Sequence, residues 1–137
     1  MYEAIDIANY TASKCLEDNF PITNLKLQKI LYYIQESYLH NRNIAFLDDI
    51  EAWQFGPVIP NVYYYFCGFG ASPINMVNER TKISKIDSDR FDAIIDSKRR
   101  LNPWDMVSEI QKKNGAWDIV YRDGFGNHQV IPNELVK

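Results

Sequence analysis

The sequence predicts an α+β fold that is mainly α: a compact bundle of about five to six helices around a central helix at Thr23–Leu39, with a small antiparallel sheet. Three observations favour this fold class. Apolar residues recur at three- and four-residue steps over most of the chain, the segment Phe46–Phe55 has an extended pattern, and Gly and Pro residues separate these stretches. At 137 residues the chain fits one domain, 1–137, around one core.

The first helix is predicted from Tyr2 to Glu17. Its apolar residues, among them Ile5, Ala8 and Ala12, fall on one helical face. Because the residue before a proline avoids the α region, we expect this helix to end before Pro21.

The central helix has a broad apolar stripe. Thr23 suits the N-cap, because its hydroxyl can accept a hydrogen bond from a first-turn amide. The stripe is formed by Leu27, Leu31, Ile34 and Tyr38 and is widened by Ile30. The pattern places the polar side opposite, at Lys26, Lys29, Gln35 and Glu36.

The segment Phe46–Phe55 is predicted to be extended, with Glu51, Trp53 and Phe55 on one face. A lone strand is unstable, so we expect a partner strand around either Thr81–Ser84 or Gln129–Ile131.

Gly56 and Pro57 follow as a predicted stop. Glycine supplies backbone freedom and proline fixes φ, so the two residues form a rigid structural corner beside Trp53 and Phe55. This corner would set the direction of the next helix.

Four further helical segments are predicted. Pro60 opens a helix at Asn61–Phe69, and a loop follows from Ala71 to Lys85. Asp87 or Ser88 caps a helix that ends in the basic run Lys98–Arg100. Asn102 and Pro103 open a third helix, whose predicted buried face is Trp104, Val107 and Ile110 and whose predicted end is Asn114–Gly115. A short fourth helix contains Trp117, Val120 and Tyr121.

Composition restricts the partners and the compartment. The net charge of −3 argues against binding to nucleic acid mainly through phosphates, so Lys98–Arg100 is interpreted as a solvated helix end. Cys15 and Cys67 form no CxxC motif and are interpreted as small buried hydrophobes in a reducing compartment. With neither a signal peptide nor a membrane-spanning run, a cytoplasmic protein is expected.

No motif for catalysis, metal binding or a cofactor is recognisable. His40 and His128 lack the spacing of a zinc site, and Gly68–Gly70 and Gly124–Gly126 lack the residues that accompany a phosphate loop. Asp48, Asp49 and Glu51 bring three carboxylates together, and Asp49 and Glu51 would share a strand face. A small enzyme that uses Asp49 and Glu51 is therefore kept as the weaker alternative to a binding protein.

Aromatic residues exceed what one small core needs. Tyr and Trp are enriched where proteins meet proteins, because each combines an apolar ring with a polar tip. Burial tendencies assign Trp53 and Tyr63 to the core, and the remaining aromatic residues are candidate partner contacts. The whole set comprises Tyr32, Tyr33, Trp53, Phe55, Tyr63, Tyr64, Tyr65 and Trp117.

Several of these motifs carry a family resemblance. The segments Asn24–Gln35, Ile50–Pro60, Val62–Tyr63, Trp104–Val107, Gly115–Trp117 and Val130–Lys137 resemble the phage-associated SocA-like family, also called the Panacea antitoxin domain. The resemblance covers nearly the whole chain.

The resemblance implies a non-enzymatic, mainly helical antitoxin that neutralises a toxin by direct binding. It also implies, from one type of member, an adaptor that delivers the toxin to a protease. Combined with the aromatic surplus, it gives the candidate partner-binding residues Lys29, Tyr32, Trp53, Phe55, Tyr63, Tyr64, Lys112 and Trp117.

One motif departs from the family pattern. Members commonly show Thr-His shortly before the Gly-x-Trp block, and this chain has Gln111 and Lys112 there, so Lys112 replaces the histidine or the target differs. A phage-encoded inhibitor of a host defence protein, such as a nuclease, is kept as the alternative function, because its scaffold would be identical.

Overall fold

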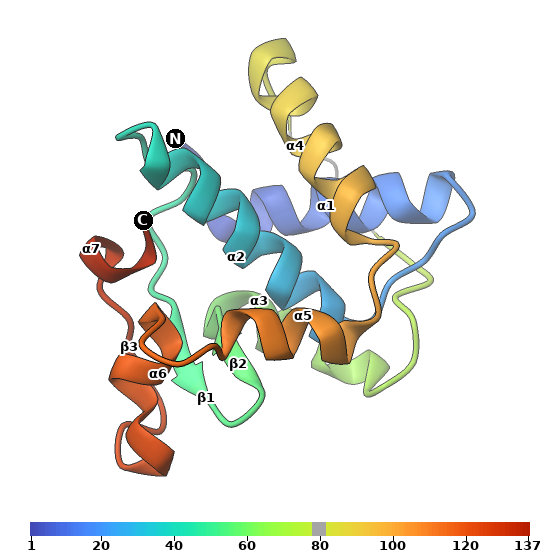
Figure 1. Ribbon diagram of the computed structural model, residues 1–137. Helices are drawn as coiled ribbons and strands as arrows, with labels where there is room; N and C mark the ends of the chain where they lie inside the picture. Colours follow the sequence, from blue (N-terminus) through green and yellow to red (C-terminus); the bar gives the residue numbers. More distant parts are fainter. Residues whose placement is uncertain (78–81) are drawn as a thin grey trace.

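A computed structural model of the chain describes residues 1–77 and 82–137 (Figure 1). It confirms the predicted class, α+β and mainly α. The helices are α1 (Ala4–Glu17), α2 (Asn24–His40), α3 (Pro60–Tyr65), α4 (Lys85–Lys98), α5 (Pro103–Ile110), α6 (Ala116–Tyr121) and α7 (Asn133–Val136), with single 3₁₀ turns η1 (Cys67–Phe69) and η2 (Arg122–Gly124). The strands are β1 (Glu51–Trp53), β2 (Gly56–Val58) and β3 (Gln129–Val130).

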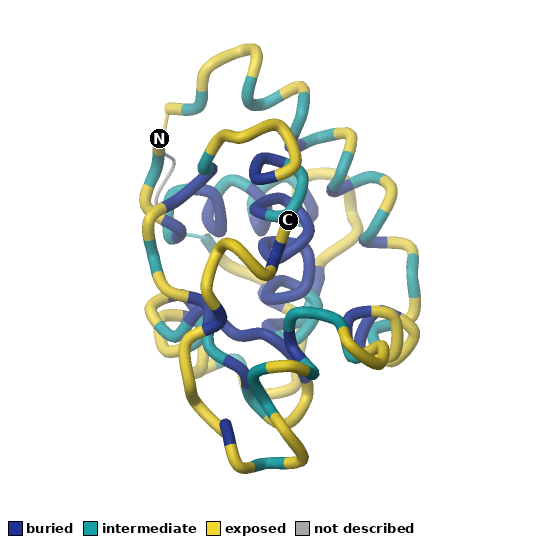
Figure 2. The backbone as a smooth tube through the Cα atoms, turned by 60° about the vertical axis from the view of Figure 1, so that its left-hand side comes forward, coloured by how far each residue is buried: buried dark blue, intermediate teal, exposed yellow. Residues whose placement is uncertain are grey.

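Helix α2 is the centre of the fold, as predicted. Thr23 caps it by accepting a hydrogen bond from the Lys26 amide, and α1, α3, α4, α5, α7 and β2 pack around it. Every residue from Leu27 to Gln35 is buried (Figure 2). The predicted polar side is therefore wrong for Lys29 and Gln35, because a helix enclosed on all sides buries its polar residues too.

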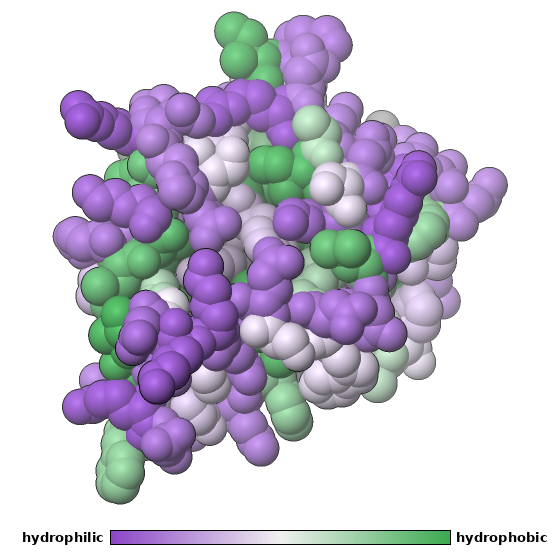
Figure 3. All heavy atoms as spheres, viewed as in Figure 1, coloured by the Kyte–Doolittle hydropathy of each residue, from purple (hydrophilic) through white to green (hydrophobic). Residues whose placement is uncertain are grey.

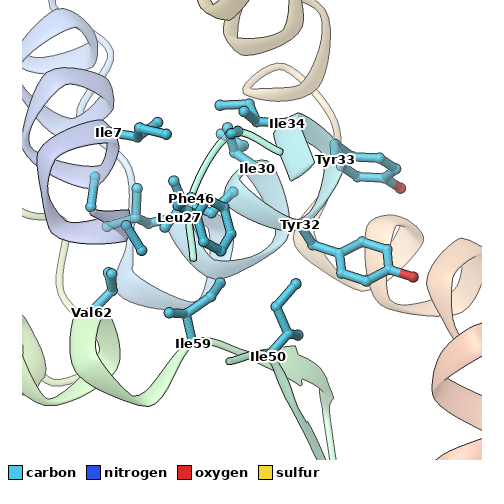
Figure 4. Close-up of a cluster of buried hydrophobic side chains, with 14 of the residues drawn as sticks. Ile7, Leu27, Ile30, Tyr32, Tyr33, Ile34, Phe46, Ile50, Ile59 and Val62 are labelled. Atoms are coloured by element: carbon cyan, nitrogen blue, oxygen red, sulfur yellow. The ribbon is translucent and has the colours of Figure 1, made fainter. Parts of the chain in front are cut away.

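The core lies between α2 and its neighbours. Figure 4 shows Ile7 of α1, Leu27 and Ile30 of α2, and Val62 of α3 directed into one space, and Phe46 belongs to the same buried cluster. Burial of such side chains supplies most of the driving force for folding.

The sheet has the order β2-β1-β3, and both pairings are antiparallel. Of the predicted extended segment Phe46–Phe55, only Glu51–Trp53 forms a strand. The predicted partner near Gln129–Ile131 is confirmed. The other candidate is not a strand at residues 82–84, and Thr81 lies outside the described residues.

The stop predicted at Gly56 and Pro57 is wrong, because both residues belong to β2. Trp53 pairs with Gly56 and Ala52 with Pro57, so β1 and β2 form a tight hairpin. Gly56 has φ +114°, which favours glycine, and β2 is an edge strand, where proline's missing N–H is tolerated. The turn thus lies two residues earlier than predicted, at Gln54 and Phe55.

Several helix boundaries also differ from the prediction. The helix predicted at Asn61–Phe69 is divided into α3 and η1. The N-cap of α4 is Ser84, whose hydroxyl accepts from the Asp87 amide, rather than Asp87 or Ser88. Ser84 is the better N-cap because its hydroxyl satisfies an amide of the first turn, which begins at Lys85.

The start of α5 is confirmed, because Asn102 caps it and Pro103 is its first residue. The helix ends at Ile110 instead of Asn114–Gly115, and its buried residues are Met106, Val107 and Ile110. The burial predicted for Trp104 is wrong, since that side chain is 55% exposed. No helix among residues 1–77 and 82–137 is long and apolar enough to cross a membrane.

Candidate functional site

The β1–β2 hairpin is the centre of an aromatic cluster. The ring of Trp53 on β1 stacks on His128, with centroids 4.3 Å apart, and meets the ring of Tyr63 on α3 edge-on at 5.0 Å. Tyr64 lies 6.2 Å from Trp53 and 5.4 Å from Tyr63. The hairpin, α3 and the distant residue His128 therefore present one group of rings.

A second aromatic pair lies at the tip of the hairpin. Phe55 meets Trp104 of α5 edge-on, with ring centroids 5.6 Å apart, and the two residues are 51% and 55% exposed. We call the six residues Trp53, Phe55, Tyr63, Tyr64, Trp104 and His128 the hairpin face. Trp53 and Tyr63 are half-buried there, so the prediction that they are core residues is wrong in part.

A cavity of about 550 Å³ opens at the hairpin face. Its wall combines five of the six residues, all but Tyr64, with residues of α2, η1 and the end of the hairpin. Figure 3 shows that hydrophobic side chains on that view form separate patches among hydrophilic ones. An aromatic-lined cavity of this size is the usual form of a recognition site.

Lys29 of α2 borders this cavity and is fully buried. Its ammonium donates a hydrogen bond to the Pro57 carbonyl, 3.1 Å away. Gly56 lies next to the Lys29 ammonium: a Cβ at position 56 would be only 3.1 Å from the Lys29 Nζ. Burial disfavours the charged form and lowers the pKa of Lys29 to about 7.

Side chains of α5, α6 and the segment between them hold the hairpin from one side. Trp117 is buried, stacks on Tyr121 with ring centroids 4.5 Å apart, and donates from its indole to the Trp53 carbonyl at 2.7 Å. Gln111, at the end of α5, donates to the Gln54 carbonyl at 2.9 Å. Gln111 is one of the two residues that depart from the family motif, and Trp117 belongs to the Gly-x-Trp block that follows. Both support the hairpin.

Amides on α2 hold the chain on the other side. The Gln28 side chain accepts from the Ile59 amide at 2.9 Å, and Asn24 donates to the Tyr63 carbonyl at 3.1 Å. Gln35 donates to the Phe46 carbonyl and accepts from the Ala45 amide. Gln28 and Gln35 thus both hydrogen-bond to the backbone that follows α2, a role that was not predicted from the sequence. Their seven-residue spacing, which places both on one side of the helix, is the signal that could have indicated it.

A second cavity, of about 350 Å³ and more polar, is bordered by Tyr32, Lys112, Glu36 and Glu109. Tyr32 is buried and Lys112 is exposed. The eight predicted contact residues therefore lie at different places. Trp53, Phe55, Tyr63 and Tyr64 belong to the hairpin face, and Lys29 borders its cavity. Tyr32 and Lys112 border the second cavity, and Trp117 is buried behind the hairpin.

The carboxylate cluster is divided among structural contacts. Asp48 accepts hydrogen bonds from the Ala4 amide and the Asn61 side chain, each at 2.8 Å. Glu51 accepts from the Trp53 indole at 2.9 Å, and Asp49 is exposed. In the part of the chain that the structure describes, no three His, Cys, Asp or Glu residues come together as metal ligands.

The basic run and the cysteines also differ from the prediction. Arg99 is buried and bridges Asp18 at 2.8 Å and Asp96 at 2.9 Å, so it is a structural residue rather than part of a solvated helix end. Cys15 is buried as predicted, whereas Cys67 is exposed.

The chain is similar to known antitoxin sequences. The model of the family described as "Antitoxin SocA-like, Panacea domain" matches residues 27–118, a range that runs from α2 into α6 and includes the hairpin. Antitoxin SocA of Caulobacter vibrioides (strain NA1000 / CB15N) is 26% identical over 133 residues, which cover 86% of this chain and 70% of that relative. No solved structure matches the chain.

Proposed function

Because this chain belongs to the antitoxin SocA-like, Panacea domain family, we propose that it is an antitoxin that neutralises a protein toxin by direct binding, without catalysis, through the hairpin face. The chain acts as one domain, 1–137, in the cytoplasm, where its target is made. The observation that carries the proposal is the exposed aromatic cluster around Trp53.

Exposed rings of this kind suit a protein partner. Phe55, Tyr64 and Trp104 are each about half exposed or more, although large aromatic residues are usually buried. Trp and Tyr are enriched among the residues that dominate binding energy, especially next to a pocket. The hairpin face combines both features, since its cavity lies among the rings.

The frame behind these rings is already ordered. Trp117 and Gln111 fix one side of the hairpin, and Gln28 fixes its exit toward α3. Preordered contacts lose less conformational entropy on association, so more of the contact energy contributes to affinity. Trp117 and Gln111 therefore act as supports, and the exposed rings act as contacts.

Co-expression tests this function. Each open reading frame adjacent to this gene is expressed alone and together with the chain, and growth and co-elution in size-exclusion chromatography are measured. We expect one neighbour to arrest growth alone, and the pair to grow and to elute as one complex.

A double variant, Phe55→Ser with Tyr64→Ser, localises the contact, and Ile86→Ser is its control. Ile86 is 76% exposed on α4, which lies at the opposite end of the molecule from the hairpin (Figure 1). The double variant loses rescue and the control keeps it. Rescue without complex formation, or loss of rescue in both variants, would contradict the proposal.

The same strains distinguish the finer alternatives. If the chain is also an adaptor, the toxin's half-life shortens when the chain is present and recovers in a protease-deficient host. If no neighbour is toxic and the chain instead suppresses a purified defence nuclease, it is an inhibitor of a host defence protein and the antitoxin function is excluded.

A further inference from the structure

We propose that the cavity of the hairpin face binds the C-terminal residue of the partner chain, with an apolar side chain against the rings and the terminal carboxylate on the Lys29 ammonium. The identity of the partner rests on the proposed function, whereas the chemistry of the pocket can be tested without it.

Lys29 is a buried cation with unused capacity. Its ammonium has three N–H donors, and the Pro57 carbonyl accepts one of them. Within the described residues, no carboxylate lies at ion-pair distance from its Nζ. Burying an ionised group without a counter-charge is costly, so lysine in this position is unfavourable for stability alone.

The residues around Lys29 preserve this position. Gly56 leaves the space that the ammonium occupies, because a side chain there would press on Nζ and the φ of +114° disfavours one. The amide side chains of Asn24 and Gln28, which border the same cavity, are already hydrogen-bonded to each other and to the backbone. Lys29 is therefore the cation of the cavity wall with donors to spare.

The lining selects the rest of the ligand. Trp53, Phe55, Tyr63 and Trp104 supply aromatic walls, and a cavity of about 550 Å³ holds a large apolar side chain. A ligand with a ring or branched aliphatic group next to a carboxylate matches both the walls and the ammonium. A carboxylate that meets a lysine in a dry site forms a charge-assisted hydrogen bond, which is stronger than a neutral one.

A chain terminus fits this arrangement better than an internal acidic residue. A terminal residue can enter a pocket without the chain leaving it again, and its carboxylate lies next to its own side chain. Lys29 has no accessible surface in the free protein, so binding requires its flexible four-carbon stem to turn from Pro57 toward the cavity.

Three small probes test the pocket directly. N-acetyl-L-phenylalanine carries the ring and the carboxylate, N-acetyl-L-phenylalaninamide lacks the charge, and N-acetyl-L-aspartyl-L-phenylalaninamide carries the charge on an internal side chain. Dissociation constants are measured by ¹H–¹⁵N chemical-shift titration of the full chain. We expect the acid to bind about tenfold more tightly than either other probe, with shifts at the hairpin face.

Lys29→Met is the matched variant, because methionine keeps most of the apolar length of lysine and removes the charge. In this variant the acid and the amide should bind equally. Equal binding in the wild type, tighter binding of the aspartyl probe, or an unchanged preference in Lys29→Met would each overturn the proposal.

The pH profile separates Lys29 from its neighbours. Because the pKa of Lys29 is about 7, the acid's affinity should fall as pH rises above 7, by about tenfold in total, until it equals that of the amide probe. The other titratable side chains that border the cavity are Tyr63 from α3, Cys67 from η1 and His128 before β3. Lys29→Met keeps all three, so any pH dependence that remains in this variant belongs to them.

The two proposals fail separately. If a neighbouring toxin binds the hairpin face and Lys29→Met binds it as tightly as the wild type does, the antitoxin function stands and the carboxylate pocket is excluded. If the acid probe binds through Lys29 and no neighbour is toxic, the pocket stands and the antitoxin function is excluded.

Discussion

Tyrosines gather on two sides of α2, and the two groups differ in what their hydroxyls meet. On the α4 side, Tyr10 donates to Asp92, and Tyr2 and Tyr38 both donate to Asp87. On the hairpin face, the hydroxyls of Tyr63 and Tyr64 have no hydrogen-bond partner among the described residues. The hydroxyls of the first group bind within the fold, whereas those of the second group are left for the partner that we propose.

The electrostatics follow the same division. Burial and the neighbouring Asp87 carboxylate raise the pKa of Tyr38, because both disfavour a phenolate. On α2 itself, the side chain of Gln35 is hydrogen-bonded to the backbone and that of Gln28 to the backbone and to Asn24, whereas Lys29, between them, is buried with one acceptor. A residue whose bonds are complete contributes to stability, and one whose bonds are incomplete is available for recognition.

The largest stability change is expected on the satisfied side, for Gln35→Leu. The leucine leaves the Phe46 carbonyl and the Ala45 amide buried without a partner, and each unpaired group costs about 1–3 kcal/mol. We expect the free energy of unfolding to fall by about 3 kcal/mol in urea denaturation. Ser37→Ala, at a half-buried position on the same helix, should change it by less than about 0.5 kcal/mol. A similar loss in both variants would show that α2 tolerates neither and that the glutamine bonds are not the cause.

A change of opposite sign is expected at Lys29. Replacing buried ion pairs by apolar groups of similar size is often stabilising by about 1–4 kcal/mol. Lys29→Met also leaves the buried Pro57 carbonyl without its hydrogen bond, which costs about 1–3 kcal/mol, so the free energy of unfolding at pH 7 should rise by only about 1 kcal/mol. If Lys29→Met lowered stability instead, the hydrogen bond to the Pro57 carbonyl would outweigh the cost of burying the ammonium, and Lys29 would be a structural residue.

The pH dependence at Lys29 has a definite sign. The folded-state pKa is lowered from 10.5 to about 7, so between these values the unfolded chain binds more protons and stability rises with pH. Below about pH 7 the cost is fully present. Urea denaturation at pH 7 and pH 9 should show this rise in the wild type, and Lys29→Met should lack it.

The sequence predicts the elements whose signals are local. Thr23 caps α2 and Asn102 with Pro103 starts α5, because each signal acts within one helical turn. The strand near Gln129 is one of the two predicted partners of β1, because a lone strand is unstable. These predictions need no knowledge of what surrounds each element.

The misses have tertiary causes. Gly56 and Pro57 resemble a stop at the end of a strand, yet the edge of a sheet accepts both. Trp104 is apolar in pattern but lies against Phe55 at the surface. Lys29 is charged but enclosed by α2 and β2. The hairpin face depends on such placements, so its region could be predicted from the aromatic residues, while its cavity could not.

A smaller effect is expected from Tyr38→Phe, which removes one hydroxyl from the Asp87 pair. The ring and its contact with Arg90 remain, so the loss should be about 1 kcal/mol at pH 7. The loss in the free energy of unfolding should be smaller for Tyr38→Phe than for Gln35→Leu, which removes every hydrogen bond of its side chain.

The effect of Tyr38→Phe should also depend on pH. Burial of Asp87 raises its pKa, but hydrogen bonds from Tyr38, Tyr2 and Ser84 outweigh this and lower it. A carboxylate with a lowered folded-state pKa contributes stability above its unfolded pKa, about 3.9, and loses it as pH falls through the folded value. The difference between wild type and Tyr38→Phe, measured by urea denaturation, should therefore shrink below about pH 4; a constant difference would mean that the hydroxyl acts through packing.

The smallest stability effect is expected on the hairpin face, and it separates the two groups of aromatic residues most directly. Phe55 is half exposed and its ring contact is with Trp104, which is itself exposed, so Phe55→Ser should change the free energy of unfolding by less than about 0.5 kcal/mol. If Phe55 contacts the partner as we propose, the same substitution should weaken binding of the toxin about tenfold in a calorimetric titration. If Phe55→Ser destabilised the chain as much as Tyr38→Phe does, the hairpin rings would belong to the structural group, and the surface on which the proposed function rests would lose its distinction from the α4 side.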